Sequence, residues 1–369
     1  MKHSPKNGGT MFTHKIVFTG GGSAGHVTPN IAIINELNRT KWDIHYIGSH
    51  KGIERELIQK IDIPYHPISS GKLRRYIDFE NIKDVFRVIR GILGARSILK
   101  KIKPNVVFSK GGFVSVPVIL AARSLKIPCL IHESDLTPGL ANKISKRFAS
   151  KIFTSFDETA KHFPATITKA IGSPIRRELL HGSKQKGLDF ITFDNTKPVL
   201  LIMGGSLGAT KINEAVRNGL SQLTEQFQIV HLCGKGNINS ELASIKGYLQ
   251  FEYVNEELAD ILAATDYVLT RGGSNAIFEF LALKIPMLII PLPKSQSRGD
   301  QILNAKNFTE NGYALTLEEE SLTTESLMAS LDELQRNTDQ IKQAMSTTKS
   351  QVALDILIDE ITMTAKKRF

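Results

Sequence analysis

Short runs of apolar, β-type residues alternate along this chain with longer segments whose apolar residues recur at helical spacing. The runs include 15–19, 44–47, 105–109, 129–132, 151–154, 199–203, 228–232, 267–270 and 286–290. Continuous apolar strands between amphipathic helices are typical of parallel sheets with helices on both faces. The pattern therefore predicts an α/β protein built from doubly wound, Rossmann-like parallel sheets.

Two features of the first half recur in the second half. A strand runs into a glycine-rich loop at 18–25 (FTGGGSAG) and again at 202–209 (IMGGSLGA). A later strand ends in a basic residue and two glycines at 108–113 (FSKGGF) and at 269–274 (LTRGGS). We expect two similar domains that join near residue 174, with ligands bound beyond the carboxyl ends of their strands.

Composition and charge narrow the class of protein. The chain has 369 residues, 41% hydrophobic and 22% charged, which is typical of a globular protein, and its formal charge of +11 favours an anionic partner. Basic residues do not interleave with aromatic ones, which argues against nucleic acid. No apolar run suggests a signal peptide or a bilayer span, and the two cysteines are expected as buried thiols in a reducing compartment, the cytoplasm.

Residues 71–103 break the alternation with one long basic and apolar stretch that ends before Pro104. Apolar residues at helical spacing between lysines and arginines predict a single amphipathic helix. Such a helix commonly packs on the sheet with a solvated outer face, and a surface for an anionic bilayer is the alternative. The side chains that would face a membrane are Lys72, Arg74, Arg75, Phe86, Arg87 and Arg90.

The first glycine-rich loop satisfies G-x-G-x-x-G at Gly20, Gly22 and Gly25, between a strand and a helix. Dinucleotide binding also needs an acidic residue at the end of the second strand, to hold a ribose. The strand at 44–49 ends without one, and Glu54 lies in the next helix. The dehydrogenase interpretation is therefore disfavoured, and the loop is expected to approach some other anionic group.

The second half offers a better nucleotide site. Its loop at 204–208 opens a helix and would present backbone N–H groups and the Ser206 hydroxyl to a diphosphate, without the lysine of a P-loop. Glu279 falls in the first turns of a helix that begins near Ser274, where a carboxylate either accepts hydrogen bonds from a ribose diol or complements the helix dipole.

Both glycine-rich loops match G-x-S-x-G formally, but no histidine and acid partners can be assigned for a serine hydrolase. No D-x-D, His-x-x-x-His or cysteine pair stands at ligand spacing, so neither a metal nor a cofactor is expected.

Seven segments taken together resemble one family. They are GGGSAGHVTPN (20–30), SGKLRRY (70–76), SKGGFVSVP (109–117), IHESDLTPGLANK (131–143), GGSLGA (204–209), RGGSNAIFE (271–279) and QSRGDQILNA (296–305). In this order they closely resemble the MurG family of bacterial N-acetylglucosaminyltransferases, in its Firmicute-like branch. The chain departs from the more familiar family pattern in three places: at Ser23 with Ala24, at Phe113 and at Asp135. The family roles that depend on the replaced side chains at those places are not carried over.

The resemblance implies a GT-B glycosyltransferase of two Rossmann-like domains, 12–174 for the acceptor and membrane and 175–349 for the donor. A C-terminal helix at about 350–369 would return to the first domain. The implied reaction is an inverting, metal-independent transfer of GlcNAc from UDP-GlcNAc to the C4 hydroxyl of MurNAc in lipid I. Because lipid I stays in the membrane, a peripheral position at its cytoplasmic face is implied. Other cell-wall synthesis and division proteins are further candidate partners.

The resemblance also implies roles for single residues. Gly22, Ser23 and Ala24 would lie near the sugar and the acceptor, and His26 is the first candidate for the catalytic base, with a structural histidine as the alternative. Glu133 is the second candidate, and a carboxylate that orients its loop is the other interpretation. The donor contacts implied are Arg176, Ser206, Val254, Gly273, Ser274, Asn275, Ala276, Glu279 and Gln301.

Two other functions remain open from the residues alone. A UDP-GlcNAc 2-epimerase would share the donor site and release UDP without a lipid acceptor. A nucleotide-binding module without chemistry would use the same loops but turn nothing over. Acceptor-dependent transfer of GlcNAc separates the transferase from both.

Overall fold

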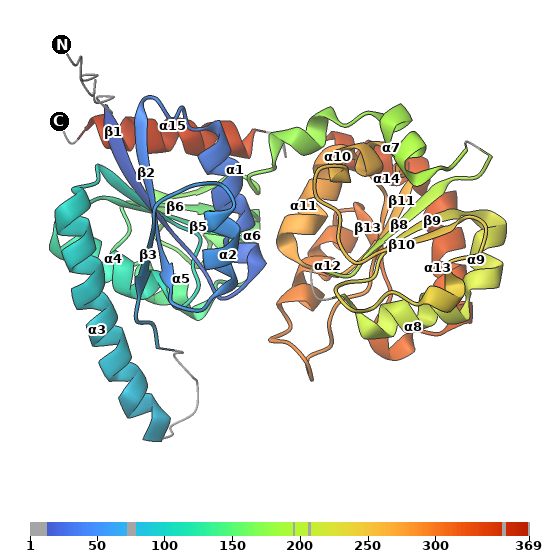
Figure 1. Cartoon of the computed structure of the whole chain (residues 1–369), viewed down its shortest axis with the longest axis horizontal. Coiled ribbons are helices and arrows are strands. Elements are labelled where there is room, and N and C mark those ends of the chain that lie inside the picture. Colours follow the sequence, from blue (N-terminus) through green and yellow to red (C-terminus); the bar gives the residue numbers. More distant parts are fainter. Residues whose placement is uncertain (1–12, 72–78, 195, 206–207, 349–351, 368–369) are drawn as a thin grey trace, which may run out of the picture. The chain divides into compact units, whose positions relative to one another are not determined.

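The structure is a computed structural model that describes residues 13–71, 79–194, 196–205, 208–348 and 352–367, with 79–85 described in backbone only (Figure 1). The chain divides into two compact units. Unit 1 comprises Met1–Glu133, Pro138–Ala170 and Leu354–Phe369, and unit 2 comprises Ser134–Thr137 and Ile171–Ala353. The division between the units after residue 137 falls at 170/171, and the sequence placed the expected domain join near residue 174.

Unit 1 is built on a seven-stranded, all-parallel sheet of order β3-β2-β1-β4-β5-β6-β7. This order reverses between β1 and β4, which is the switch point where doubly wound sheets bind ligands. The elements of unit 1 are β1 (His14–Thr19), η1 (Ala24–His26), α1 (Thr28–Glu36), β2 (Trp42–Ser49), α2 (Ile53–Gln59), β3 (Tyr65–Ile68), α3 (Phe79–Ile102), β4 (Val106–Ser109), α4 (Ser115–Ser124), β5 (Cys129–Glu133), α5 (Leu140–Ser145), β6 (Lys151–Thr154), α6 (Asp157–Ala160), η2 (Ala165–Ile167), β7 (Thr168–Ala170) and α15 (Ala353–Lys366).

Alternate side chains of the central strands of unit 1 enter cores on opposite faces of the sheet. Ile47 of β2 belongs to the core that buried side chains of α3 and α4 complete. Its neighbour Tyr46 points to the other face, where Asn30 of α1 donates to its hydroxyl. The last helix, α15, also lies along unit 1, and its Glu360 pairs with Lys151 of β6 (Figure 1).

Unit 2 repeats the arrangement with six parallel strands in the order β10-β9-β8-β11-β12-β13. The switch point lies between β8 and β11, so both glycine-rich repeats of the sequence end at switch points. The elements are η3 (Arg177–His181), α7 (Lys184–Ile191), β8 (Val199–Met203), α8 (Thr210–Asn218), α9 (Leu220–Gln226), β9 (Gln228–Leu232), η4 (Ser240–Leu242), β10 (Tyr248–Phe251), α10 (Leu258–Ala264), β11 (Tyr267–Thr270), α11 (Ser274–Leu283), β12 (Met287–Ile289), α12 (Asp300–Glu310), β13 (Ala314–Thr316), η5 (Glu319–Ser321), α13 (Thr324–Arg336) and α14 (Thr338–Ser346).

A neutral histidine is built into the core of unit 2. His231 of β9 is fully buried, with Nε2 2.9 Å from Asn213 Oδ1 and Nδ1 2.8 Å from the Tyr248 hydroxyl. An amide oxygen only accepts, so Nε2 carries the proton and the tyrosine donates to Nδ1. Burial, with a smaller contribution from Arg217, lowers the pKa of His231 to about 3.

This histidine predicts a loss of stability in acid. The unfolded chain protonates His231 near its ordinary pKa of 6.5 and the folded chain only near 3, so acidification between those values favours unfolding. The slope is about 1.4 kcal/mol per pH unit, or roughly 2 kcal/mol between pH 6.5 and 5. We expect urea unfolding at several pH values to show this extra loss in the wild type and not in His231→Gln. A His50→Gln variant, changed at an exposed histidine, should keep the wild-type slope, and equal slopes in all three proteins would contradict the prediction.

Candidate active site

The loop after β1 and the loop after β4 meet backbone to backbone at the switch point of unit 1. Gly112 has φ +83°, and a Cβ there would lie 2.1 Å from the carbonyl oxygen of Gly21. Gly22 also has a left-handed φ, of +85°. Of the residues predicted to meet the sugar and acceptor, Gly22 and Ser23 are exposed and Ala24 is half-buried, in the short turn η1. The loop therefore offers its surface to a ligand.

A buried carboxylate lies beneath this loop. Glu54 of α2 is fully buried, and its Oε2 accepts from the N–H of Gly22 at 3.2 Å. Its Oε1 accepts from the backbone N–H of Ser49 at 3.0 Å and from the Ser49 hydroxyl at 2.5 Å. No role was expected for Glu54 from the sequence, because it does not stand at the position of a ribose-binding acid. Glu54 binds the backbone of the glycine-rich loop rather than a ribose.

His26 closes the same loop. Its Nδ1 lies 3.0 Å from the carbonyl oxygen of Gly21 and 3.1 Å from Ser23 Oγ. A carbonyl oxygen only accepts, so the contact with Gly21 places a proton on Nδ1 of the neutral ring. Nε2 is then the basic nitrogen of His26.

Glu133, the second candidate base, holds the start of α5. The residue is buried at the end of β5, and its Oε2 accepts from the N–H of Gly139 at 3.0 Å and from Asn142 Nδ2 at 2.8 Å. These contacts favour the loop-orienting interpretation of Glu133. A second buried pair, which no sequence pattern indicated, lies at this edge of the sheet: Lys110 places Nζ 2.6 Å from Nδ1 of His132.

In unit 2 the glycine-rich loop after β8 leads into α8. Gly205 and Gly208 have φ of +109° and +78°, and a Cβ on Gly208 would lie 2.2 Å from the carbonyl oxygen of Cys233. Only glycine therefore lets this loop approach the end of β9 so closely. Ser206, predicted to contact a diphosphate, lies outside the described residues.

Two predicted donor contacts are paired with each other. Arg176 Nε donates to Glu279 Oε1 at 3.0 Å, and Arg176 Nη2 donates to Glu279 Oε2 at 3.2 Å. The two side chains are 22% and 10% exposed. Burial alone would lower the pKa of Arg176, but the Glu279 carboxylate, with Glu178 and Tyr253, raises it above its ordinary value. The pair brings a cation and an acid to the start of α11, from positions 103 residues apart.

The other predicted donor contacts lie on loops that follow strands or at helix starts. Val254 is buried just after β10. Gly273 is the N-cap of α11, and Ser274, Asn275 and Ala276 form its first turn. Gln301 lies at the start of α12, where its Oε1 accepts from the N–H of Leu292 at 3.0 Å, so its Nε2 is the group that could donate to sugar hydroxyls.

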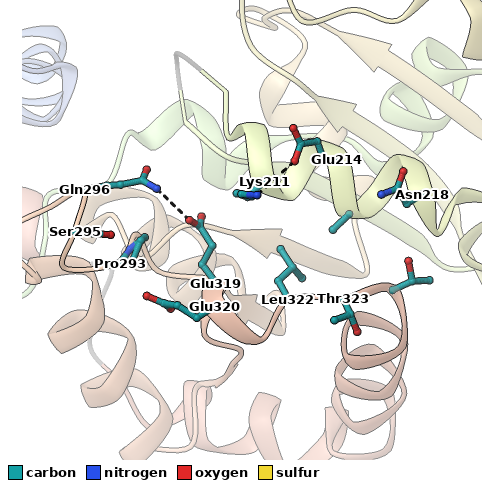
Figure 2. Close-up of a pocket in the computed structure, with 12 residues that line it drawn as sticks. Lys211, Glu214, Asn218, Pro293, Ser295, Gln296, Glu319, Glu320, Leu322 and Thr323 are labelled. Carbon is teal, nitrogen blue, oxygen red and sulfur yellow. Dashed lines mark hydrogen bonds and ion pairs between the residues drawn. The ribbon is translucent and has the colours of Figure 1, made fainter.

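A cavity of about 420 Å³ lies elsewhere in unit 2 (Figure 2). Gln296 and Glu319 point toward each other across it, and Lys211 lies beside Glu214 on α8. Its lining consists of Lys211, Glu214, Ala215, Asn218, Pro293, Ser295, Gln296, Glu319, Glu320, Leu322, Thr323 and Thr324. None of the predicted donor residues is among them. Within the described ranges, no three His, Cys, Asp or Glu side chains form a metal-ligand set.

The long helix α3 has apolar residues on two opposite sides. Gly91, Ala95 and Leu99 are buried, whereas Phe86 and Leu93 are 68% and 64% exposed. At about 100° per residue these two sets lie half a turn apart. Arg87 and Arg90 are exposed on the same helix, whose first turns extend beyond the rest of unit 1 (Figure 1). Lys72, Arg74 and Arg75 lie outside the described residues. No helix in the described part of the chain is long and apolar enough to cross a bilayer.

Two Rossmann-like units with glycine-rich loops at their switch points fit the GT-B class of protein that the family resemblance implied. The model of the glycosyltransferase family 28 N-terminal domain matches residues 16–154, and that of the family 28 C-terminal domain matches residues 199–358. A relative from Shouchella clausii is 58% identical over 94% of this chain and 98% of its own. It is named UDP-N-acetylglucosamine--N-acetylmuramyl-(pentapeptide) pyrophosphoryl-undecaprenol N-acetylglucosamine transferase. The chain therefore belongs to the MurG family within glycosyltransferase family 28, which confirms the resemblance found in the sequence.

Solved structures agree on the fold. The crystal structure of Acinetobacter baumannii MurG has a TM-score of 0.75 at 24% identity, covering 95% of this chain and 99% of that one. A UDP-GlcNAc 2-epimerase from Neisseria meningitidis bound to UDP-GlcNAc has a TM-score of 0.65 at 14% identity, covering 95% and 99%. At these identities the likeness concerns the fold alone. The epimerase alternative is therefore not favoured over the 58%-identical transferase.

Proposed function

We propose that the chain transfers GlcNAc from UDP-GlcNAc to the C4 hydroxyl of MurNAc in undecaprenyl-diphospho-MurNAc-pentapeptide (lipid I), releasing UDP and lipid II for peptidoglycan synthesis. The observation that carries the proposal is the 58% identity to a named transferase over nearly the whole of both chains. The reaction inverts the anomeric centre and needs no divalent metal. The described residues fit, because a cation and backbone N–H groups are available for the leaving diphosphate.

The donor is held by unit 2. Arg176 binds the diphosphate together with the loop that contains Ser206, and Glu279 accepts the ribose hydroxyls. The observed pairing of these two side chains supports the assignment, since it holds both at the start of α11. Val254 offers its backbone to uracil, Gln301 binds the GlcNAc hydroxyls, and Gly273–Ala276 lines the nucleotide.

The acceptor is activated from unit 1. Nε2 of His26 takes the proton of the C4 hydroxyl as its oxygen bonds to the anomeric carbon of GlcNAc. The bond from that carbon to the UDP oxygen breaks at the same time, and UDP leaves with the electron pair. The fixed Nδ1 contact with Gly21 supports this role because it leaves Nε2 as the basic nitrogen.

The proposal assigns residues 12–174, with the helix at about 350–369, to the acceptor and the membrane, and 175–349 to UDP-GlcNAc. The test uses the purified full chain and labelled UDP-GlcNAc, with and without lipid I. GlcNAc transfer that depends on lipid I is the expected result. Release of UDP without a lipid acceptor would instead indicate a 2-epimerase. Donor binding with no turnover in either condition would leave only a binding module.

The enzyme meets its acceptor at the cytoplasmic face of the membrane, as a peripheral protein. The exposed side of α3 supports this placement, because Phe86, Ile89 and Leu93 lie beside Arg90 on the side away from the core. Apolar side chains enter the lipid interface while nearby cations attract anionic headgroups, at about 1 kcal/mol per charge. Other cell-wall synthesis and division proteins are candidate partners at the same membrane.

This placement predicts the effect of a double substitution on α3. In Phe86→Ser/Leu93→Ser, we expect binding to vesicles that contain anionic lipid to fall at least about tenfold. Each of the two apolar side chains contributes about 1.5–3 kcal/mol to binding when it is buried in the bilayer. Cosedimentation with vesicles measures the change. Ile238→Ser, at a 51% exposed residue of unit 2, is the matched control and should bind as the wild type does. Equal binding by all three proteins would argue against α3 as the membrane surface.

A further inference from the structure

We propose that Glu54 is a positioning residue that acts on His26 through the peptide group between Gly21 and Gly22. The inference rests on the proposed role of His26 as the base. The N–H of Gly22 donates to Glu54 Oε2 at 3.2 Å, and the carbonyl oxygen of Gly21 accepts from His26 Nδ1 at 3.0 Å. That N–H and that carbonyl belong to one planar peptide group. Carboxylate, peptide and imidazole therefore form a single hydrogen-bonded chain.

The surroundings of Glu54 are built to hold its carboxylate in this place. A Cβ on Gly21, Gly48 or Gly52 would lie 2.6, 2.9 or 2.1 Å from the nearest atom of the Glu54 side chain. The second carboxylate oxygen accepts from Ser49, whose own carbonyl oxygen accepts from the Tyr65 hydroxyl at 2.6 Å. Glu54 is therefore a fully buried acid that is committed to the loop, and it does not reach solvent.

The chain of contacts favours one form of the histidine. A negative charge at the N–H end of a peptide polarises it and strengthens its carbonyl as an acceptor. The strengthened carbonyl oxygen of Gly21 holds the proton on Nδ1 of His26. Nε2 is then the nitrogen that takes the proton of the C4 hydroxyl of the acceptor substrate. When Nε2 is protonated, the same contact stabilises the imidazolium. The arrangement resembles a carboxylate that orients a catalytic histidine, with a peptide group inserted between them.

The test is Glu54→Gln, which keeps the size of the side chain but replaces one acceptor oxygen with an NH₂ group. We expect kcat to fall about 10- to 100-fold, less than the loss for a carboxylate bonded directly to a histidine, while KM for UDP-GlcNAc stays within about twofold. In ¹⁵N NMR of the full chain, His26 should shift from the Nδ1–H tautomer toward a mixture. Tyr65→Phe is the control, because it disturbs the same pocket but leaves the contacts of Gly21 and Gly22 in place.

The outcomes distinguish a positioning role of Glu54 from a purely structural one. Wild-type kcat and an unchanged tautomer in Glu54→Gln would overturn the proposal, and a lower kcat with an unchanged tautomer would reduce Glu54 to a structural role. If Glu54→Gln does not fold, Glu54→Asp keeps the charge but withdraws it from Gly22, and a wild-type tautomer in that variant would also overturn the proposal. If His26→Ala is active, His26 is not the catalytic base. The His26 tautomer measured by NMR in Glu54→Gln would still decide whether Glu54 acts on His26.

Discussion

His26→Ala is expected to lower kcat by about 10²- to 10⁴-fold, the usual contribution of a general base, with little change in the Kd for UDP-GlcNAc. The donor contacts proposed here all belong to unit 2, whereas His26 lies in unit 1 at the end of η1. Removal of the imidazole therefore slows proton transfer from the acceptor hydroxyl without removing a donor contact. Steady-state kinetics with lipid I and calorimetric binding of UDP-GlcNAc measure the two effects separately.

His50→Ala is the matched control for this variant, because His50 is an exposed histidine of the same unit. It should retain wild-type kcat and Kd. If His26→Ala also retains wild-type kcat, the ring has only the structural role of bonding the loop at Gly21. A loss that appeared mainly in the donor Kd would instead place His26 in the donor site.

Arg176→Ala is expected to weaken UDP binding by about 10- to 150-fold, since a hydrogen bond to a charged group is worth about 1.5–3 kcal/mol. The same change should lower the free energy of unfolding by about 3 kcal/mol, because it leaves the largely buried carboxylate of Glu279 without its cation. Uridine, which has no diphosphate, should lose much less affinity than UDP. Titration calorimetry and urea unfolding measure these effects.

A double-mutant cycle separates the two consequences. Compared with the single variants Arg176→Ala and Glu279→Gln, the double variant Arg176→Ala/Glu279→Gln removes both charges. It should recover most of the stability that Arg176→Ala loses while UDP still binds weakly. Stability losses that simply add across the cycle would show that the pair is not coupled. Equal losses of UDP and uridine affinity would mean that Arg176 does not contact the diphosphate.

The sequence predicted the interior of both sheets and missed their edges. The apolar runs it identified are the interior strands, whereas β3, β7, β10 and β13 were not recognised, and these are the four edge strands. Interior strands are buried on both faces and read as continuous apolar runs. The edge strands are largely half-buried, and β3 (YHPI) even contains a proline, so they lack that signal.

The candidate site shows a similar division. Glycine-rich loops follow strands directly, so their place at the switch points could be read from the chain. The contact of Arg176 with Glu279 joins residues far apart in the sequence, and the contact of Glu54 with Gly22 depends on how α2 packs against β2 and β3. Neither pairing leaves a local pattern in the sequence, because Arg176, Glu279 and Glu54 are each ordinary charged residues when taken alone and the partner of Glu54 is a backbone N–H group.

The placement of α15 determines how the two units could be produced as separate polypeptides. Unit 1 takes its final helix from the end of the chain, after the whole of unit 2. A fragment that stops at residue 170 would lack the buried stripe of Leu357, Ile361 and Ala365 and expose the surface they cover. Unit 2, in contrast, is nearly continuous from 171 to 353. Unit 2 is therefore the half that is easier to produce on its own, and unit 1 would need the last helix joined behind residue 170.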